Sequence, residues 1–446
     1  MKKIQTVILL CLLLASLYAC ESRQLNQQDP QPVVGESVES VQPEEPEETQ
    51  PSIPENAPAF YQTMQEVQGK QVFELSTAQD LFDLSDWVAQ GNETENMVFV
   101  LQNDIDLENE LFTPIGSIGA TFRGTFLGQG YTVSGLNVSE GRYGEAAGFF
   151  GVIGGNAFVD GLHVNGTVTA CQMAGGLVGF AGSNRGADGL SEIPVDVTIQ
   201  NCSFTGTVYG LANDIGGFVG TTGAERVLIS RCTVDADVYG EESLGGFGGC
   251  LGDQALVENC ASFGDVIADS RESLLAKTDF STPEWGTQSS EKEIYLRYIG
   301  GFAGMNIGTL TNCLSTGAVK TMEVAKTVGG FVGYESDQDV SCYYFMDYNA
   351  HWKAGYPVGD TAFMTAQGLY YNEINKRENF DGWDFETIWQ MGETHPELRT
   401  DCLSLDQYLS SDFSSEELPQ QSDNITGDSS SSNGAGYQSL VPFKGC

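Results

Sequence analysis

The sequence predicts an all-β fold in which short strands stack as repeated units, a β-solenoid. One observation is a glycine-rich phrase that recurs at Ala174, Gly216, Gly245, Gly300 and Gly329. The second is that an alternating stretch of small and apolar residues recurs in step with these phrases. Self-similarity at a period of about 29 residues is typical of a stacked repeat array. Alternation with a period of two indicates strands.

Every second residue of the alternating stretches is expected to point into the core. An apolar residue three positions upstream of each stretch breaks the alternation, so we expect the chain to turn a corner there. The inward columns are Cys202, Phe204, Gly206 and Val208; Cys232, Val234, Ala236 and Val238; Cys260, Ser262, Gly264 and Val266; and Cys313, Ser315, Gly317 and Val319.

The glycine-rich phrases resemble the GLUG motif of secreted bacterial proteins, which include adhesins and noncatalytic parts of immunoglobulin A peptidases. Copies such as Gly216-Gly-Phe-Val-Gly220 and Gly329-Gly-Phe-Val-Gly333 carry the resemblance, which covers about residues 72–399. The resemblance implies a right-handed parallel β-helix on the cell surface. It implies no catalytic residues.

The N-terminus predicts export. Lys2 and Lys3 precede an apolar run that ends at Leu17-Tyr-Ala-Cys20, which is too short to cross a bilayer and is typical of a signal peptide. The ending resembles a bacterial lipobox, so we expect Cys20 to be lipidated; cleavage and free secretion is the alternative.

The rest of the chain is expected to divide into five further segments. A short helix with Leu81, Leu84 and Val88 on one face should close the first end of the stack, and an aromatic-rich segment should close the last. In order after the signal peptide at 1–19, the segments are a lipid-anchored Pro/Glu-rich linker at 20–58, an N-terminal cap with the helix at 59–97, the β-helix at 98–345, a C-terminal cap at 346–399, and a disordered Ser/Asp-rich tail at 400–446.

Cysteine is abundant for an exported chain, with 11 residues. Because Cys202, Cys232, Cys260 and Cys313 lead equivalent columns, we expect buried, packed thiols, and disulfides are the alternative. Close CxxC spacing of the kind found in zinc sites does not occur.

The formal charge of −41 excludes a general nucleic-acid binder and argues against docking on anionic lipid by charge. Contact with a membrane is therefore expected only through the lipid anchor. The sequence contains no HExxH or GxSxG motif, and it indicates no catalytic, cofactor or metal residues. His163 is expected to face outward. Carboxylates that share a strand face, such as Asp104 with Asp106 and Asp235 with Asp237, are expected to be solvated; a calcium site is the alternative.

Exposed aromatic rings are the candidate ligand contacts. They are Trp285, in an insertion at 269–297, and Trp352 and Tyr356, in the aromatic segment. We therefore interpret the chain as a surface-displayed lipoprotein that acts as an adhesin or ligand-binding scaffold for glycans or for host or extracellular matrix proteins. The alternatives are a carbohydrate-active β-helical hydrolase or lyase and a structural envelope protein.

Overall fold

The chain divides into two compact units, Met1–Ile53 and Pro54–Cys446. The computed structural model describes residues 57–184, 196–223, 225–278, 296–322, 325–335, 339–349, 351, 366–399 and 401–411, all of them in the second unit. None of the helices among these residues is long and apolar enough to cross a membrane.

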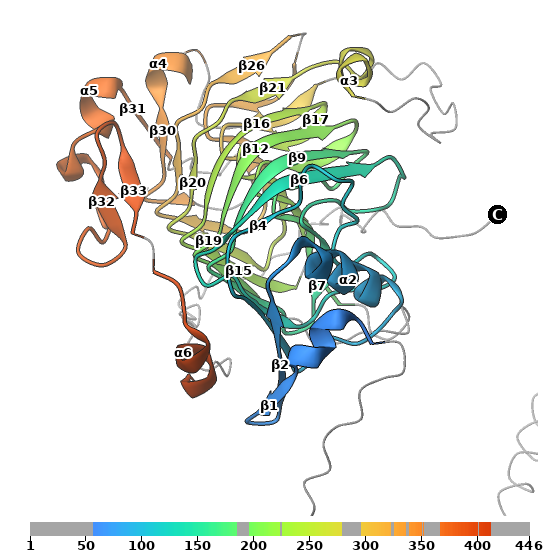
Figure 1. Cartoon of the computed structure of the whole chain (residues 1–446). Helices are drawn as coiled ribbons and strands as arrows, with labels where there is room; N and C mark the ends of the chain where they lie inside the picture. Colours follow the sequence, from blue (N-terminus) through green and yellow to red (C-terminus); the bar gives the residue numbers. More distant parts are fainter. Residues whose placement is uncertain are drawn as a thin grey trace, which may run out of the picture. The chain divides into compact units, whose positions relative to one another are not determined.

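The described chain is mainly β-structure in several mostly parallel sheets (Figure 1). The ten-stranded sheet contains, in spatial order, β1 (Gln65–Val67), β2 (Lys70–Leu75), β3 (Met97–Leu101), β5 (Thr125–Leu127), β8 (Phe158–Asp160), β11 (Asp196–Gln200), β15 (Arg226–Ser230), β19 (Ala255–Glu258), β24 (Thr309–Thr311) and β29 (Asp339–Val340).

The eleven-stranded sheet contains β31 (Gln367–Leu369), β30 (Tyr343–Phe345), β25 (Leu314–Ser315), β20 (Ala261–Ser262), β16 (Thr233–Gly240), β12 (Ser203–Gly210), β9 (His163–Ala170), β6 (Thr132–Glu140) and β4 (Ile105–Asp106), with β21 (Val266–Ala268) and β26 (Val319–Thr321) beside this path. The six-stranded sheet contains β28 (Val332–Glu335), β23 (Ala303–Asn306), β18 (Gly248–Leu251), β14 (Val219–Thr222), β10 (Val178–Ser183) and β7 (Phe150–Gly154). The four-stranded sheet contains β13 (Asn213–Gly216), β17 (Glu242–Gly245), β22 (Arg297–Gly300) and β27 (Val328–Gly329).

The prediction of a single right-handed parallel β-helix with end caps is wrong. The strands are divided among separate sheets of ten, eleven, six and four strands, and the pairs β1–β2 and β32–β33 are antiparallel, with β32 at Trp389–Met391 and β33 at Pro396–Leu398. The sequence pattern describes one strand at a time. It does not show how left-handed corner residues, such as Asn201 with φ 53°, distribute the strands among sheets.

The inward columns are confirmed. Val208, Val238, Val266 and Val319 are paired in register across parallel strands, and each is at most 3% exposed. Cys202, Cys232, Cys260 and Cys313, which we call the ladder cysteines, are buried thiols that form no disulfide, and Cys342 is also buried. Each thiol sulfur contacts backbone carbonyl oxygens; Cys232 Sγ, for example, lies 3.2 Å from the Ser230 oxygen.

The phenylalanine of the glycine-rich phrase forms a second inward ladder. Phe218, Phe247, Phe302 and Phe331 stack with ring centroids 4.8, 4.8 and 5.1 Å apart. The glycines before them allow neighbouring repeats to approach closely. A Cβ atom on Gly217 would lie 2.2 Å from the Gly246 carbonyl oxygen. The phrase therefore combines a ring that fills the core with backbone that tolerates no side chain.

The helical segments are η1 (Ala59–Thr63), α2 (Ala78–Ala89), α3 (Arg271–Lys277), α4 (Met346–Asn349), α5 (Tyr371–Ile374), η2 (Arg377–Asn379) and α6 (Leu405–Ser410). The expected helix is α2, and Leu81, Leu84 and Val88 are buried as expected. Its capping box begins at Thr77: the Thr77 side chain accepts the Asp80 N–H, and the Asp80 side chain accepts the Thr77 backbone N–H.

The aromatic segment packs beside the sheets. Trp383, Phe385 and Trp389 belong to a buried cluster with Ala261, Leu314 and Tyr343, which come from β20, β25 and β30. We call residues 366–399 the C-terminal module. In Figure 1, β31, α5 and β32–β33 lie along the side of β20 and β30. This segment was expected to plug the end of the stack, but outward apolar residues on those strands give it a lateral surface instead.

The expected disordered tail does not hold for residues 401–411. Helix α6 places Tyr408 in a cluster with Val72, Val98 and Phe158, on strands of the ten-stranded sheet. The Tyr408 hydroxyl hydrogen-bonds with Thr125 Oγ1 at 2.7 Å and accepts from Lys70 Nζ at 3.1 Å. Apolar burial and two hydrogen bonds thus hold this segment to the N-terminal strands.

Candidate functional site

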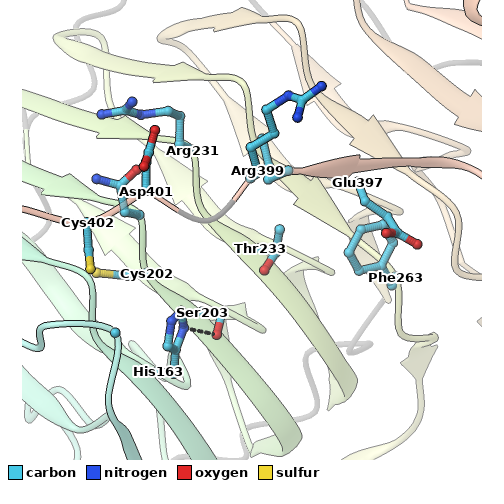
Figure 2. Close-up of a pocket in the computed structure, with 13 residues that line it drawn as sticks. His163, Cys202, Ser203, Arg231, Thr233, Phe263, Glu397, Arg399, Asp401 and Cys402 are labelled. Carbon is cyan, nitrogen blue, oxygen red and sulfur yellow. Dashed lines mark hydrogen bonds between the residues drawn. The ribbon is translucent and has the colours of Figure 1, made fainter. Parts of the chain in front are cut away.

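A groove lies between the outer surface of the repeats and the chain that leaves the C-terminal module (Figure 2). Its volume is about 500 Å³. We call it the lateral groove. Its lining residues are Gly130, His163, Asn201, Cys202, Ser203, Arg231, Thr233, Phe263, Glu397, Leu398, Arg399, Asp401 and Cys402.

The floor is formed by outward residues at the start of three neighbouring strands. His163 of β9 is paired in register with Ser203 of β12, which is paired with Thr233 of β16. His163 Nδ1 and Ser203 Oγ are 2.8 Å apart and point toward one another in Figure 2. Burial lowers the pKa of His163, and the Asp104 carboxylate opposes this shift only in part. The imidazole is therefore neutral at pH 7, with one nitrogen able to accept and one to donate.

The edge of the floor is formed by two corner residues. Asn201 and Arg231 both have left-handed backbone conformations, with φ of 53° and 51°. Asn201 Nδ2 donates to Asp160 Oδ1 over 2.6 Å. Asn201 Oδ1 is buried and has no hydrogen-bond partner among the described residues. A buried acceptor without a partner is costly and is a place where a ligand donor would be stabilised.

The wall of the groove is formed by residues 397–399 together with Asp401 and Cys402. Arg399 fixes its beginning by donating from Nε to the Trp389 carbonyl oxygen over 3.1 Å. Asp160 fixes its end, because Asp160 Oδ2 accepts the Leu403 N–H over 2.7 Å. Burial raises the pKa of Asp160, while its hydrogen bonds lower it in part. Cys402 packs so closely on Gly161 that a Cβ there would lie 2.5 Å from Cys402 Cβ.

The two ends of the groove differ in chemistry. Figure 2 shows Phe263 and Glu397 at one end, and Cys202 and Cys402 at the other. The Phe263 ring stacks on His395 with centroids 4.6 Å apart. The groove thus offers hydroxyl, amide, guanidinium, imidazole and carboxylate groups together with one aromatic ring. Such a mixture suits a polar ligand that has many hydroxyl groups.

The sequence identified only part of this site. Cys20, Trp285, Trp352 and Tyr356, the residues predicted for lipidation and ligand contact, lie outside the described residues. His163 was expected to face outward, and it lines the groove. Arg231 and Asn201 were missed, although the sequence carried a signal. Most of the ladder cysteines follow asparagine, whereas Cys232 follows arginine.

The paired carboxylates lie elsewhere. Asp104 Oδ1 accepts the Thr132 N–H over 2.8 Å, and Asp106 Oδ1 accepts the Glu108 N–H over 2.9 Å. Asp235 and Asp237 are exposed outward residues of β16. Within the described ranges, no group of three or more His, Cys, Asp or Glu side chains is arranged to hold a metal ion.

The comparisons with known proteins give one structural neighbour. No family model and no curated protein sequence matches the chain. A crystal structure from Bacteroides ovatus, described as a "putative immunoglobulin A1 protease", is similar, with a TM-score of 0.52 and 18% sequence identity. The match covers 74% of this chain and 93% of that one. At this identity, the likeness concerns the fold alone.

Proposed function

We propose that this chain is a surface-displayed lipoprotein that binds glycans in the lateral groove. One observation carries the proposal: a cavity of about 500 Å³ whose lining includes hydroxyl, amide, imidazole, guanidinium and carboxylate groups, with Asn201 Oδ1 buried and without a hydrogen-bond partner among the described residues. Ligand sites combine a concave shape with a few fixed polar groups. This groove has both.

The polar groups are held in place by the fold. Ser203 and Thr233 lie on paired strands, and Asn201 is tied to buried Asp160. Sites built on strands are more rigid than sites on free loops, so less ordering is required when a ligand binds. Asp401 and Glu397 can accept hydrogen bonds from sugar hydroxyls, and the edge of Phe263 supplies apolar contact.

Display on the envelope is supported by the sequence alone. The apolar run that ends at Cys20 and the Pro/Glu-rich residues 20–58 are those of a lipid-anchored tether, and the glycine-rich phrases resemble the GLUG motif of secreted proteins. Cys20→Ala should release the protein from the membrane fraction, because stable attachment would depend on acyl chains. A mutant protein that stays in the membrane fraction at high salt contradicts the anchor.

The binding test is a glycan array probed with the full chain. Thr233→Trp should fill the groove and abolish binding without unfolding the protein, because Thr233 is an outward residue of β16. Thr205→Trp is the matched control, since Thr205 is an exposed outward residue of β12 that does not line the groove. Equal glycan binding by both variants would overturn the proposal, as would an array on which the wild-type chain binds nothing.

A further inference from the structure

Arg231 stands where the backbone favours other residues. The equivalent corner of each repeat has a left-handed conformation, and it is formed by Gly161, Asn201, Arg231, Asn259, Asn312 and Ser341, with φ between 51° and 63°. Glycine and asparagine enter this conformation at the lowest cost. Arginine does so at a higher cost, so the backbone of this corner does not favour arginine over asparagine.

The Arg231 guanidinium is also the exception among the arginines. Across the described residues, it forms no ion pair and no side-chain hydrogen bond, and it borders the lateral groove. The other described arginines have partners. Arg123, Arg142, Arg226, Arg271, Arg297 and Arg377 form ion pairs, and Arg399 donates to backbone carbonyl oxygens.

Beside Arg231 is the acceptor that lacks a donor. Asn201 occupies the same corner of the preceding repeat, one strand spacing away, and its Oδ1 is buried without a partner in the described chain. An unpaired planar cation next to an unpaired acceptor is complementary to a carboxylate with a hydroxyl group close by. Arginine binds carboxylate with two parallel hydrogen bonds.

We propose that the lateral groove selects acidic sugars, with the sugar carboxylate on Arg231 and a neighbouring hydroxyl donating to Asn201 Oδ1. This inference rests on the proposed glycan-binding function and adds its specificity. Sialic and uronic acids share the required carboxylate. Asp401 and Glu397 accept hydrogen bonds from the remaining sugar hydroxyls. The sugar carboxylate is bound by Arg231 alone, so the groove as a whole does not need a net positive charge.

A structural role for Arg231 makes a different prediction. Burial raises the pKa values of Asp160 and Glu258, and the Arg231 charge lowers both in part. If Arg231 served mainly as their counter-charge, Arg231→Asn would lower the melting temperature. If it serves a ligand, Arg231→Asn should keep or raise the melting temperature, because asparagine suits the corner, and should still lose the acidic ligand.

The experiment measures the affinity of the full chain by titration calorimetry at fixed salt. The ligand pairs are sialyllactose with lactose, and trigalacturonate with its methyl ester. The wild type should prefer at least one acidic member by about tenfold or more, corresponding to about 1.4 kcal/mol. Arg231→Asn should remove that preference, and Arg231→Lys should retain part of it. Arg226→Asn, which breaks an ion pair outside the groove, should leave it unchanged.

The outcomes separate the two proposals. An acidic preference that survives Arg231→Asn overturns the inference, and so does a wild type that prefers the acidic member of neither pair; in both cases glycan binding itself stands. A marked fall in the melting temperature of Arg231→Asn assigns Arg231 to the structure and also overturns the inference. If no glycan binds the wild type, the proposed function fails first.

Discussion

One row of outward residues crosses the eleven-stranded sheet and changes character halfway. The row is paired in register from strand to strand. Its first half is polar and open to the lateral groove, whereas its second half is apolar and covered by the C-terminal module. The open half is His163, Ser203 and Thr233; the covered half is Ala261, Leu314 and Tyr343.

The backbone does not cause this difference, because both halves belong to the same parallel sheet and both have buried inward neighbours. The side chains cause it. Leu314 and Tyr343 offer apolar area that the module buries, at about 25 cal/mol per Å². Ser203 and Thr233 would lose hydration under such a cover. A repeat array can therefore produce both a docking surface and a groove by changing one outward residue per strand.

The largest effect is expected from the inward row that both halves share. Val238 is 0% exposed and paired with Val208 and Val266, so Val238→Asp places an unpaired charge in the core. This cost is comparable to the whole stability of a domain, and the variant should fail to fold. Asp235→Ala, at an exposed position of the same strand, is the control. If thermal melting followed by circular dichroism left the two variants alike, the inward register would have to be abandoned.

The next largest effect is expected from a substitution that exposes the apolar half of the outward row. Trp389 is fully buried, contacts Trp383 with centroids 4.2 Å apart, and donates from Nε1 to Asn259 Oδ1 over 3.2 Å. Trp389→Ala should cost about 3–5 kcal/mol and release the C-terminal module from the sheet. Limited proteolysis should then cut within residues 366–399 before the repeats. Leu111→Ala, at a residue that is 65% exposed, should change neither result. Simultaneous digestion of module and repeats would contradict separate packing.

The sequence was sufficient for everything that depends on local periodicity. The inward valine column, the buried thiols and the burial of Leu81, Leu84 and Val88 all follow from which side chains recur at which spacing. These features require only that strands alternate and helices have one apolar face. The same rule places His163 on the outside.

What the sequence did not show depends on contacts between distant residues. The hydrogen bond from the Leu403 N–H to Asp160 joins residues 243 positions apart, and no local sequence pattern predicts it. The division into several sheets depends on the backbone conformations at the corners. Asparagine at Asn201 and its equivalents is compatible with a left-handed corner, but it does not determine which sheet the next strand joins. The lateral packing of Trp389 depends on apolar outward residues of β20 and β25 that the repeat pattern alone did not distinguish from solvated ones.

A pH titration should show that the main charge-linked instability lies outside the groove. Burial raises the pKa of Asp214 to about 7, and the nearby Glu242 carboxylate adds to the shift. The unfolded chain loses this proton near pH 4. Between about pH 4 and 7 the folded state therefore binds more protons, and the free energy of unfolding falls as the pH rises.

Asp214→Asn should make this fall shallower and should raise stability at pH 8 by about 1 kcal/mol or more. Urea unfolding at pH 5 and pH 8 measures both changes. Asp235→Ala, at an exposed carboxylate, should keep the wild-type slope. An unchanged slope in Asp214→Asn would mean that the Asp214 carboxyl ionises in the folded protein as it does in the unfolded chain.

The smallest effect on stability is expected at helix α6, which follows the residues that form the wall of the lateral groove. Tyr408→Phe removes the hydrogen bonds to Thr125 and Lys70 but leaves the ring against Phe158, whose centroid is 5.3 Å away. The loss should be about 1 kcal/mol and local to residues 401–411. Hydrogen exchange of the Leu403 amide, which donates to Asp160, should become faster, while exchange in β20 and β25 should not change. Because the covered half is held by the module, faster exchange there would show that the two halves of the row are coupled.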